Sequence, residues 1–570
     1  MTLGRLERLV ISSMILALCA IACGDRGGLG TPGGGTPMGS GGSAGTFSGA
    51  AGRGAPGGRL GGLAGGGPGG SASGGLGGAA GRGAQIITKN LSTTSKVDLL
   101  FMIDDSAGMA PLQAKMQAQI PAFVDALTDP ATAQLPDLHV AVVSSSFGGG
   151  AWGNVNQCFS RLANPNTLGD DGGRFLQGAV GPNPSPCTML HTGTKFLANR
   201  DGFTLGPNYD GALSDALKCI AILGDKGCGF ESPFESVYYG LYKGLQPDDP
   251  DNGGFVRADA ALAIVMLTNE DDCSVAGDSL LLAPSVNSVS DPTGLGALQS
   301  YRCNEFGHLC DGVPPPHDHV PPTGVTLRNC VSAENDGKTD DLLVDPNGQR
   351  DPSRGHLWPT VAELSNYVRM YKSDPDDIFV AAIAGPVIDA KGNSLYRVIP
   401  QVNSAAMNEI DPVVDHSCVQ ATAAGAEPEY ADPAVRIKQW VDSFGANGAF
   451  YPICANDFKA AMVGIATKIH AKLGAFCIAT DVELSQADPA QHDCQLTRKT
   501  IDASGKQTTQ ALPECAAGAS NAPCFTLVPN AIECGDPASK TLVKICENAA
   551  CAGPPLSSDV VFTATCTAPR

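Results

Sequence analysis

The fold of this chain is decided by the stretch Val97-Asp98-Leu99-Leu100-Phe101-Met102-Ile103-Asp104-Asp105-Ser106-Ala107-Gly108-Met109. Its apolar residues form a nearly unbroken run, which is typical of a strand buried on both faces of a parallel sheet. Two carboxylates, a hydroxyl and a glycine follow directly, at the carboxyl end of that strand, where open α/β sheets bind their ligands. Apolar residues at helical spacing from Gln113 to Leu127 place this polar cluster in a strand-to-helix turn.

Further along the chain, apolar strands alternate with amphipathic helices. Strands are predicted at 138–143, 259–268, 377–384 and 449–453, and helices at 212–223, 233–245, 360–371, 433–444 and 456–473. This alternation predicts an α/β fold with a doubly wound, mostly parallel sheet covered by helices on both faces. The predicted domain spans 95–476, with loop-rich inserts at about 151–209 and 274–355.

The run that ends in Asp104, Ser106 and Gly108 resembles the first strand and metal-site loop of the von Willebrand factor A (vWA) domain family, whose signature is Asp-x-Ser-x-Ser. The first two positions match, and the third is Gly108, which has no hydroxyl. The resemblance implies a Rossmann-like domain with a divalent cation at the carboxyl edge of its sheet. It also implies a protein ligand whose carboxylate fills an open position on that cation.

The resemblance implies two further ligand positions. A threonine loop should precede the helix at 233–245, and this sequence offers Glu231 or Ser232 there instead. The Asp that follows a later strand in the family falls near Asn269, with Glu270 beside it. Carboxylate and hydroxyl oxygens favour Mg²⁺ or Ca²⁺. The predicted metal ligands are Asp104, Ser106, Glu231, Ser232, Asn269 and Glu270. The alternative is a lost site, whose polar side chains cap the next helix and bind loop backbone.

The N-terminal part of the chain has the features of an export signal and a linker. Arg5 and Arg8 precede an apolar stretch that ends at Cys23, which predicts a lipoprotein signal peptide at 1–23 with Cys23 as the lipidated residue. The alternative is an ordinary signal peptide cleaved near Ala22. Residues 24–84 are mostly Gly with Ala, Ser, Pro and Arg, and this composition predicts a disordered linker. The predicted location is therefore a bacterial membrane, on its periplasmic or cell-surface side.

The chain contains 20 cysteines, and setting aside Cys19 and Cys23 leaves an even number. In an exported chain this predicts a disulfide framework. Eight of the cysteines lie between Cys477 and Cys566. Together with short β-type runs, they predict a separate, small all-β module at 477–570.

The composition and motifs restrict the functional class. The formal net charge is −20 and no basic patch is evident, which argues against a nucleic-acid partner and leaves the lipid as the membrane attachment. Outside the predicted linker at 24–84, no GxSxG, HExxH or phosphate-loop motif occurs, so no catalytic residue is assigned and no enzyme is predicted. We expect a binding protein for adhesion or envelope assembly. The alternatives are a structural scaffold with a lost metal site and an unrecognised extracytoplasmic enzyme.

Overall fold

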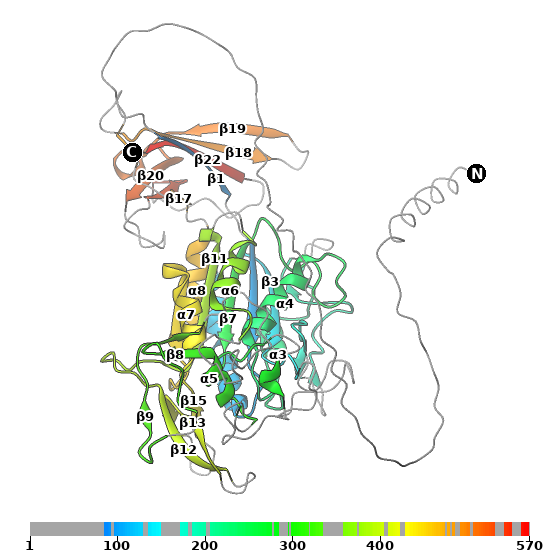
Figure 1. Ribbon diagram of the computed structural model, residues 1–570. Coiled ribbons are helices and arrows are strands. Elements are labelled where there is room, and N and C mark those ends of the chain that lie inside the picture. The colour runs from blue at the N-terminus through cyan, green and yellow to red at the C-terminus, as the bar shows by residue number, and fades with distance from the viewer. Residues whose placement is uncertain are drawn as a thin grey trace, which may run out of the picture. The chain divides into compact units, whose positions relative to one another are not determined.

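The structure is a computed structural model (Figure 1). The described residues are 85–92, 96–128, 135–149, 171–179, 185–200, 206–275, 279–283, 295, 298–317, 320–333, 357–372, 375–403, 409–421, 428–473, 476–478, 482–484, 491–501, 506–529, 541–549 and 560–568. The predicted signal peptide, Cys23 and the linker at 24–84 lie outside these ranges. Within the ranges, no helix is long and apolar enough to cross a membrane.

The central sheet has six strands, and five of them are parallel. They are β2 (Lys96–Ile103), β3 (Asp137–Ser144), β6 (Leu197–Ala198), β7 (Ala261–Leu267), β11 (Ile378–Ala384) and β16 (Gly448–Pro452). Their spatial order is β16-β11-β7-β2-β3-β6, and the short edge strand β6 runs antiparallel to β3. Both β7 and β11 are buried along their whole length, as the apolar runs predicted. The predicted α/β fold with a mostly parallel sheet is confirmed.

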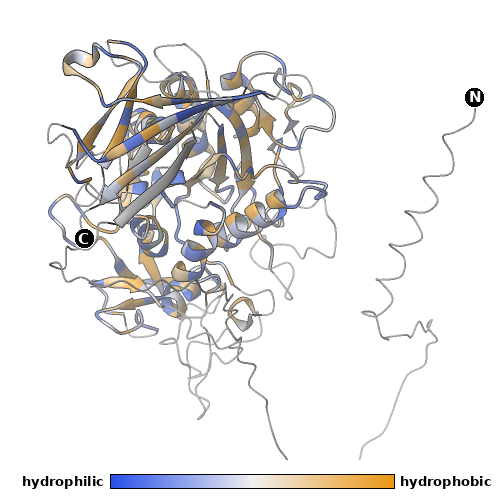
Figure 2. Cartoon of the chain, turned by 90° about the horizontal axis from the view of Figure 1, so that it is seen from above, coloured by the Kyte–Doolittle hydropathy of each residue, from blue (hydrophilic) through white to orange (hydrophobic). Residues whose placement is uncertain are grey.

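Helices cover both faces of this sheet. One face carries α2 (Met109–Leu127), α3 (Leu213–Ile220) and α8 (Lys459–Lys472), and the other carries α4 (Pro233–Leu245), α6 (Val361–Arg369) and α7 (Val435–Asp442). Successive side chains of β2 enter opposite cores, with Phe101 packed towards Phe123 of α2 and Leu100 towards the α4 side. The hydropathy of these elements can be followed in Figure 2.

The strand order reverses between β2 and β7. Counted along the chain, the strands lie in the order third, second, first, fourth, fifth, sixth. The helix after β2 (α2) therefore packs on one face, whereas α6, which follows β7, packs on the other. At such a reversal the two connections leave in opposite directions, and the carboxyl ends of the strands border a crevice where α/β proteins bind ligands.

Smaller elements occupy the inserts. The predicted inserts contain β4 (Gly178–Ala179), β5 (Ser185–Pro186), α5 (Tyr301–Gly307), β8 (His308–Cys310), β9 (Val325–Thr326) and β10 (Cys330–Ser332). A third insert, between β11 and α7, was not predicted, and it contains β12 (Arg397–Asn403), β13 (Glu409–Asp415), β14 (Cys418–Gln420) and β15 (Glu429–Ala431). Pro400 and Pro412 lie opposite each other in β12 and β13. Prolines inside a run argue against a strand when only the sequence is known.

The C-terminal residues form two small antiparallel sheets. Their strands are β17 (Phe476–Ile478), β18 (Cys494–Ile501), β19 (Gln507–Leu512), β20 (Cys524–Pro529), β21 (Thr541–Cys546) and β22 (Val560–Ala568). The sheet orders are β1-β22-β18-β19 and β17-β21-β20. The edge strand β1 (Gln85–Ser92) comes from the other end of the folded chain, and all eight of its residues pair with β22. The separate module at 477–570 stays a prediction, but its sheet includes this distant strand.

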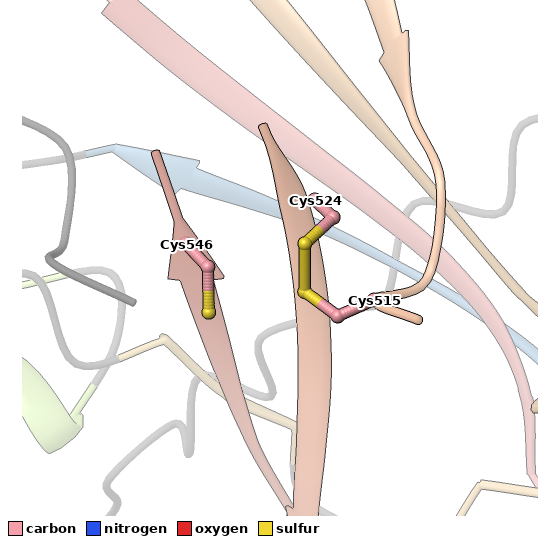
Figure 3. Close-up of side chains that lie close together, drawn as sticks. All are labelled: Cys515, Cys524 and Cys546. Atoms are coloured by element: carbon pink, nitrogen blue, oxygen red, sulfur yellow. A yellow bond between two sulfur atoms is a disulfide. The ribbon is translucent and has the colours of Figure 1, made fainter. Parts of the chain in front are cut away.

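The predicted disulfide framework is confirmed for the cysteines whose side chains the structure describes. Six pairs are Cys187–Cys219, Cys273–Cys303, Cys310–Cys330, Cys418–Cys454, Cys494–Cys566 and Cys515–Cys524. Cys228 and Cys546 are disulfide-bonded as well. Figure 3 shows the sulfur of Cys546 beside the Cys515–Cys524 bridge. The three Sγ atoms all lie within 4.8 Å of one another. Because all three are in disulfides, none of them is a thiolate ready to bind a metal.

The pairing of β1 with β22 leads to the first prediction. A chain that begins at residue 96 should expose the edge of β22 that faces β1, because eight cross-strand partners are then missing. We expect hydrogen–deuterium exchange in β22 to accelerate about tenfold, which corresponds to about 1.4 kcal/mol of opening free energy. A chain that begins at residue 85 is the control. Equal exchange in the two chains would contradict the pairing.

Candidate metal centre

The polar side chains that follow β2, β3 and β7 meet at the carboxyl edge of the sheet. Asp104 is the hub of this group and is fully buried. Its Oδ1 accepts hydrogen bonds from the backbone N–H of Ser106 and from Ser145 Oγ, both at 2.8 Å. Its Oδ2 accepts from Thr268 Oγ1 at 2.8 Å. Burial raises the pKa of Asp104, and these hydrogen bonds oppose the rise. One carboxylate thus joins the loops after three neighbouring strands.

Four buried oxygen atoms near this hub have no hydrogen-bond partner with a fixed proton among the described residues, although Glu231 and Glu270 are close enough to share a carboxyl proton. They are Ser106 Oγ, both carboxylate oxygens of Glu231, and Asn269 Oδ1. These side chains are 3%, 1% and 1% exposed. A buried acceptor without a partner costs about 1–3 kcal/mol, so such a concentration calls for an ion or a water molecule. All four atoms are oxygen, which is the ligand type that Mg²⁺ and Ca²⁺ prefer.

The carboxylates of this edge repel one another. Burial raises the pKa of Glu231 well above its usual value, and the charges of Glu270 and Asp104 raise it further. Burial, followed by the charge of Asp432, raises the pKa of Glu270 to about 8. Without a counter-charge, Glu270 therefore keeps its proton at neutral pH. A divalent cation would lower these pKa values again, because its charge favours the ionised carboxylates.

The structure brings together most of the predicted ligands. Asp104, Ser106, Glu231 and Glu270 lie at this edge, linked by the hydrogen bonds and the charge interactions given above. Asn269 directly follows Thr268, whose hydroxyl donates to Asp104. Ser232 precedes α4 as its N-cap residue, and its backbone N–H donates to Ser145 O at 2.7 Å. That any of the six binds a metal stays a prediction.

The possible coordination is not a cage of three carboxylates. Across the described ranges, the one group of three His, Cys, Asp or Glu ligand atoms lying mutually within 4.8 Å is the sulfur cluster of Figure 3. A cation at the sheet edge would therefore take hydroxyl and amide oxygens, such as Ser106 Oγ and Asn269 Oδ1, together with carboxylate oxygen and water. Mixed oxygen sets of this kind suit Mg²⁺ and Ca²⁺.

A neighbouring carboxyl group, that of Asp105, has a structural role. Ser146 Oγ donates to Asp105 Oδ1 at 2.8 Å, and the N–H of Gly227 donates to the backbone oxygen of Asp105 at 2.6 Å. A Cβ atom on Gly227 would lie 2.3 Å from Asp105 Oδ1, so only glycine fits there. This contact fixes the loop that leads to Glu231.

Sequence reasoning missed the residues that approach this edge from the third insert. The backbone N–H of Asp432 donates to Asn269 O at 2.8 Å, and the side chain of Asp432 hydrogen-bonds His416 Nδ1 at 2.7 Å. The ring of Tyr430 stacks on His416 with a centroid distance of 4.2 Å. These residues lie more than 140 positions after Asn269, and no local pattern marks them. Thr268 was also missed, because it reads as the last residue of an apolar strand.

Comparison with known proteins gives little guidance. No protein-family model matches the chain, and no curated protein sequence matches it. One solved structure that matches is the open conformation of the pilus adhesin SpaC from Lactobacillus rhamnosus GG, at 9% sequence identity and a TM-score of 0.27. The match covers 85% of this chain and 40% of that adhesin, so the chain spans less than half the length of its neighbour. This likeness is too weak to support a conclusion about fold or function.

The raised pKa of Glu270 leads to the second prediction. Because the folded protein holds this proton up to about pH 8, whereas an unfolded Glu has a pKa of 4.5, the metal-free protein should lose stability as the pH rises between these values. Each such proton contributes up to about 1.4 kcal/mol per pH unit. Glu270→Gln should therefore flatten the fall and raise the melting temperature at pH 8.

The measurement is thermal unfolding in chelator from pH 5 to 8.5. Asp248→Asn is the matched control, because Asp248 is exposed and belongs to a surface turn. If wild type and Glu270→Gln lost stability with identical slopes, Glu270 would not carry the buried proton.

Proposed function

We propose that this protein is an exported binding protein of the vWA-like type, which holds Mg²⁺ or Ca²⁺ at the carboxyl edge of its central sheet. The observation that carries the proposal is the set of buried oxygens on Ser106, Glu231 and Asn269 that have no hydrogen-bond partner with a fixed proton. They belong to the same sheet edge as Asp104, and the carboxyl groups there have raised pKa values. A cation would account for both the buried oxygens and the raised pKa values, because it binds oxygen ligands and compensates negative charge.

The topology supports this assignment. The proposed site lies where the strand order reverses, between β2 and β7, and a short antiparallel strand closes the sheet beyond β3. A Rossmann-like sheet with its ligand at this point is what the resemblance of the stretch at 97–109 implies. Thr268 also supplies a hydroxyl to Asp104, although it comes from a different loop than the resemblance implies.

The disulfides support the proposed location. Fourteen described cysteines are disulfide-bonded, and such a framework persists in oxidising compartments outside the cytoplasm. We propose that a lipid on Cys23 and the linker at 24–84 present the folded part at a bacterial membrane. The proposed partner is another protein, in adhesion or envelope assembly. The net charge of −20 makes a nucleic acid a poor partner, and no catalytic role is proposed.

The rival function is a scaffold that binds no metal, which Gly108 favours because it removes one hydroxyl ligand. The two candidates differ in what the buried oxygens contact. In a scaffold, water alone would satisfy Glu231 and Asn269, and added cations would change nothing.

Calorimetric titration of Ca²⁺, Mg²⁺ and Mn²⁺ into the metal-free chain gives the third prediction. We expect binding with a dissociation constant of about 10⁻⁶ to 10⁻³ M, within the range of protein calcium sites. Glu231→Gln keeps the shape of the side chain but removes its charge, so it should weaken binding at least about tenfold. Asp248→Asn should bind like wild type. If no ion gave heat or changed the melting temperature, the scaffold would be the correct description.

A further inference from the structure

The position that departs from the Asp-x-Ser-x-Ser pattern faces a tyrosine. Gly108 precedes α2 and has a φ of +91°, a conformation that favours glycine. A Cβ atom built on Gly108 would lie 3.4 Å from the hydroxyl oxygen of Tyr430 and 3.7 Å from Asn269 Nδ2. The hydroxyl of Tyr430 therefore lies beside the space into which a serine at position 108 would project.

Several contacts hold Tyr430 at this place. Tyr430 lies in β15, which pairs with β14, and its ring stacks on His416 at an interplanar angle of 21°. The preceding residue, Glu429, forms a salt bridge with Lys115 of α2. On the other strand, Cys418 is disulfide-bonded to Cys454, which follows β16. The hairpin is thus fastened to two elements of the α/β domain, and the position of the phenol is fixed by both.

The surroundings of the phenol are those of the proposed cation. Burial raises the pKa of Tyr430, and the carboxylates of Glu270, Asp432, Glu231 and Asp104 raise it further, in that order. All four charges therefore act on one hydroxyl, which also lies beside the Gly108 position that Asn269 Nδ2 faces. The phenol is neutral at physiological pH and offers an uncharged oxygen, as a serine would.

We propose that Tyr430 closes the metal centre, with its phenol oxygen in place of the hydroxyl that Gly108 lacks. This inference rests on the proposed function, since it needs a cation at the sheet edge. A phenol ligand would also change how the cation affects a protein partner. Ser106, Glu231 and Asn269 are at most 3% exposed, and the hydroxyl of Tyr430 lies beside Gly108, the exposed residue that precedes α2. With the phenol as a ligand, the cation fastens hairpin β14–β15 to the ends of β2 and β7.

A partner would then sense the cation through the position of the hairpin. The exposed Val419 of β14, which is 59% accessible, belongs to the surface whose position the cation would fix. Such an indirect effect differs from direct binding of a partner's carboxylate at an open coordination position, which the sequence resemblance implies.

The test compares Tyr430→Phe with wild type in the full chain, and it supplies the fourth prediction. The substitution removes one oxygen and keeps the ring that stacks on His416, so the metal-free melting temperature should not change. Calcium affinity should fall at least about tenfold. Calcium should slow hydrogen–deuterium exchange of residues 418–431 in wild type and have little effect on them in the variant. Tyr371→Phe is the matched control, because its hydroxyl contacts Tyr367 on α6.

A second measurement needs no variant. When a phenol oxygen binds a cation, the ultraviolet absorption of that tyrosine changes, so calcium should give wild type a tyrosine difference spectrum. If wild type binds calcium without such a spectrum, or if Tyr430→Phe binds with unchanged affinity, the role of Tyr430 is overturned and the metal centre stands. If wild type binds no cation, the proposed function itself fails, and this inference fails with it.

Discussion

Burying carboxylates at the edge of a parallel sheet is the constraint on which the functional part of this structure depends. Asp104 is wholly inaccessible to water, and its three hydrogen bonds join the loops after β2, β3 and β7. These bonds stabilise one carboxylate. They leave Glu231 and Glu270 to repel each other in a low-dielectric environment, which is why the pKa values of both are raised. The loops therefore converge on carboxyl groups whose raised pKa values favour the protonated form unless a counter-charge is present.

The sheet explains why this charge gathers at one point. The strands β2, β7 and β11 are apolar on both faces, so their helices must cover both sides and the polar residues are confined to the strand ends. Because the connections after β2 and β7 leave towards opposite faces, their ends stay open to a ligand. The third insert then returns to this opening. Its hydrogen bond from Asp432 to Asn269, and the placement of Tyr430 beside Gly108, bring this insert against the edge.

Much of the fold could be predicted because it depends on local apolar patterns. The stretch from Val97 to Ile103 and the run at 259–268 were predicted as buried strands, and both lie at the centre of the sheet. Candidate ligands at the strand ends could also be found, since strand ends in one sheet lie at one edge. The third insert could not, because Pro400 and Pro412 lie inside its strands, where a sequence pattern argues against a strand, and its contacts join residues far apart in sequence. The strand β1 could not be predicted either, because its partner β22 lies more than 460 residues later. The role of Tyr430 depends on the backbone of Gly108, which no sequence pattern gives.

The central claim is that a divalent cation lies among the buried oxygens of Ser106, Glu231 and Asn269. The most direct measurement is anomalous diffraction from crystals of the protein grown with Mn²⁺, which has oxygen preferences similar to those of Mg²⁺. The account predicts one strong anomalous peak at the carboxyl end of β2, within about 2.0–2.6 Å of oxygen atoms from these side chains. Water density at that place without an anomalous signal, in crystals with millimolar Mn²⁺, would contradict it.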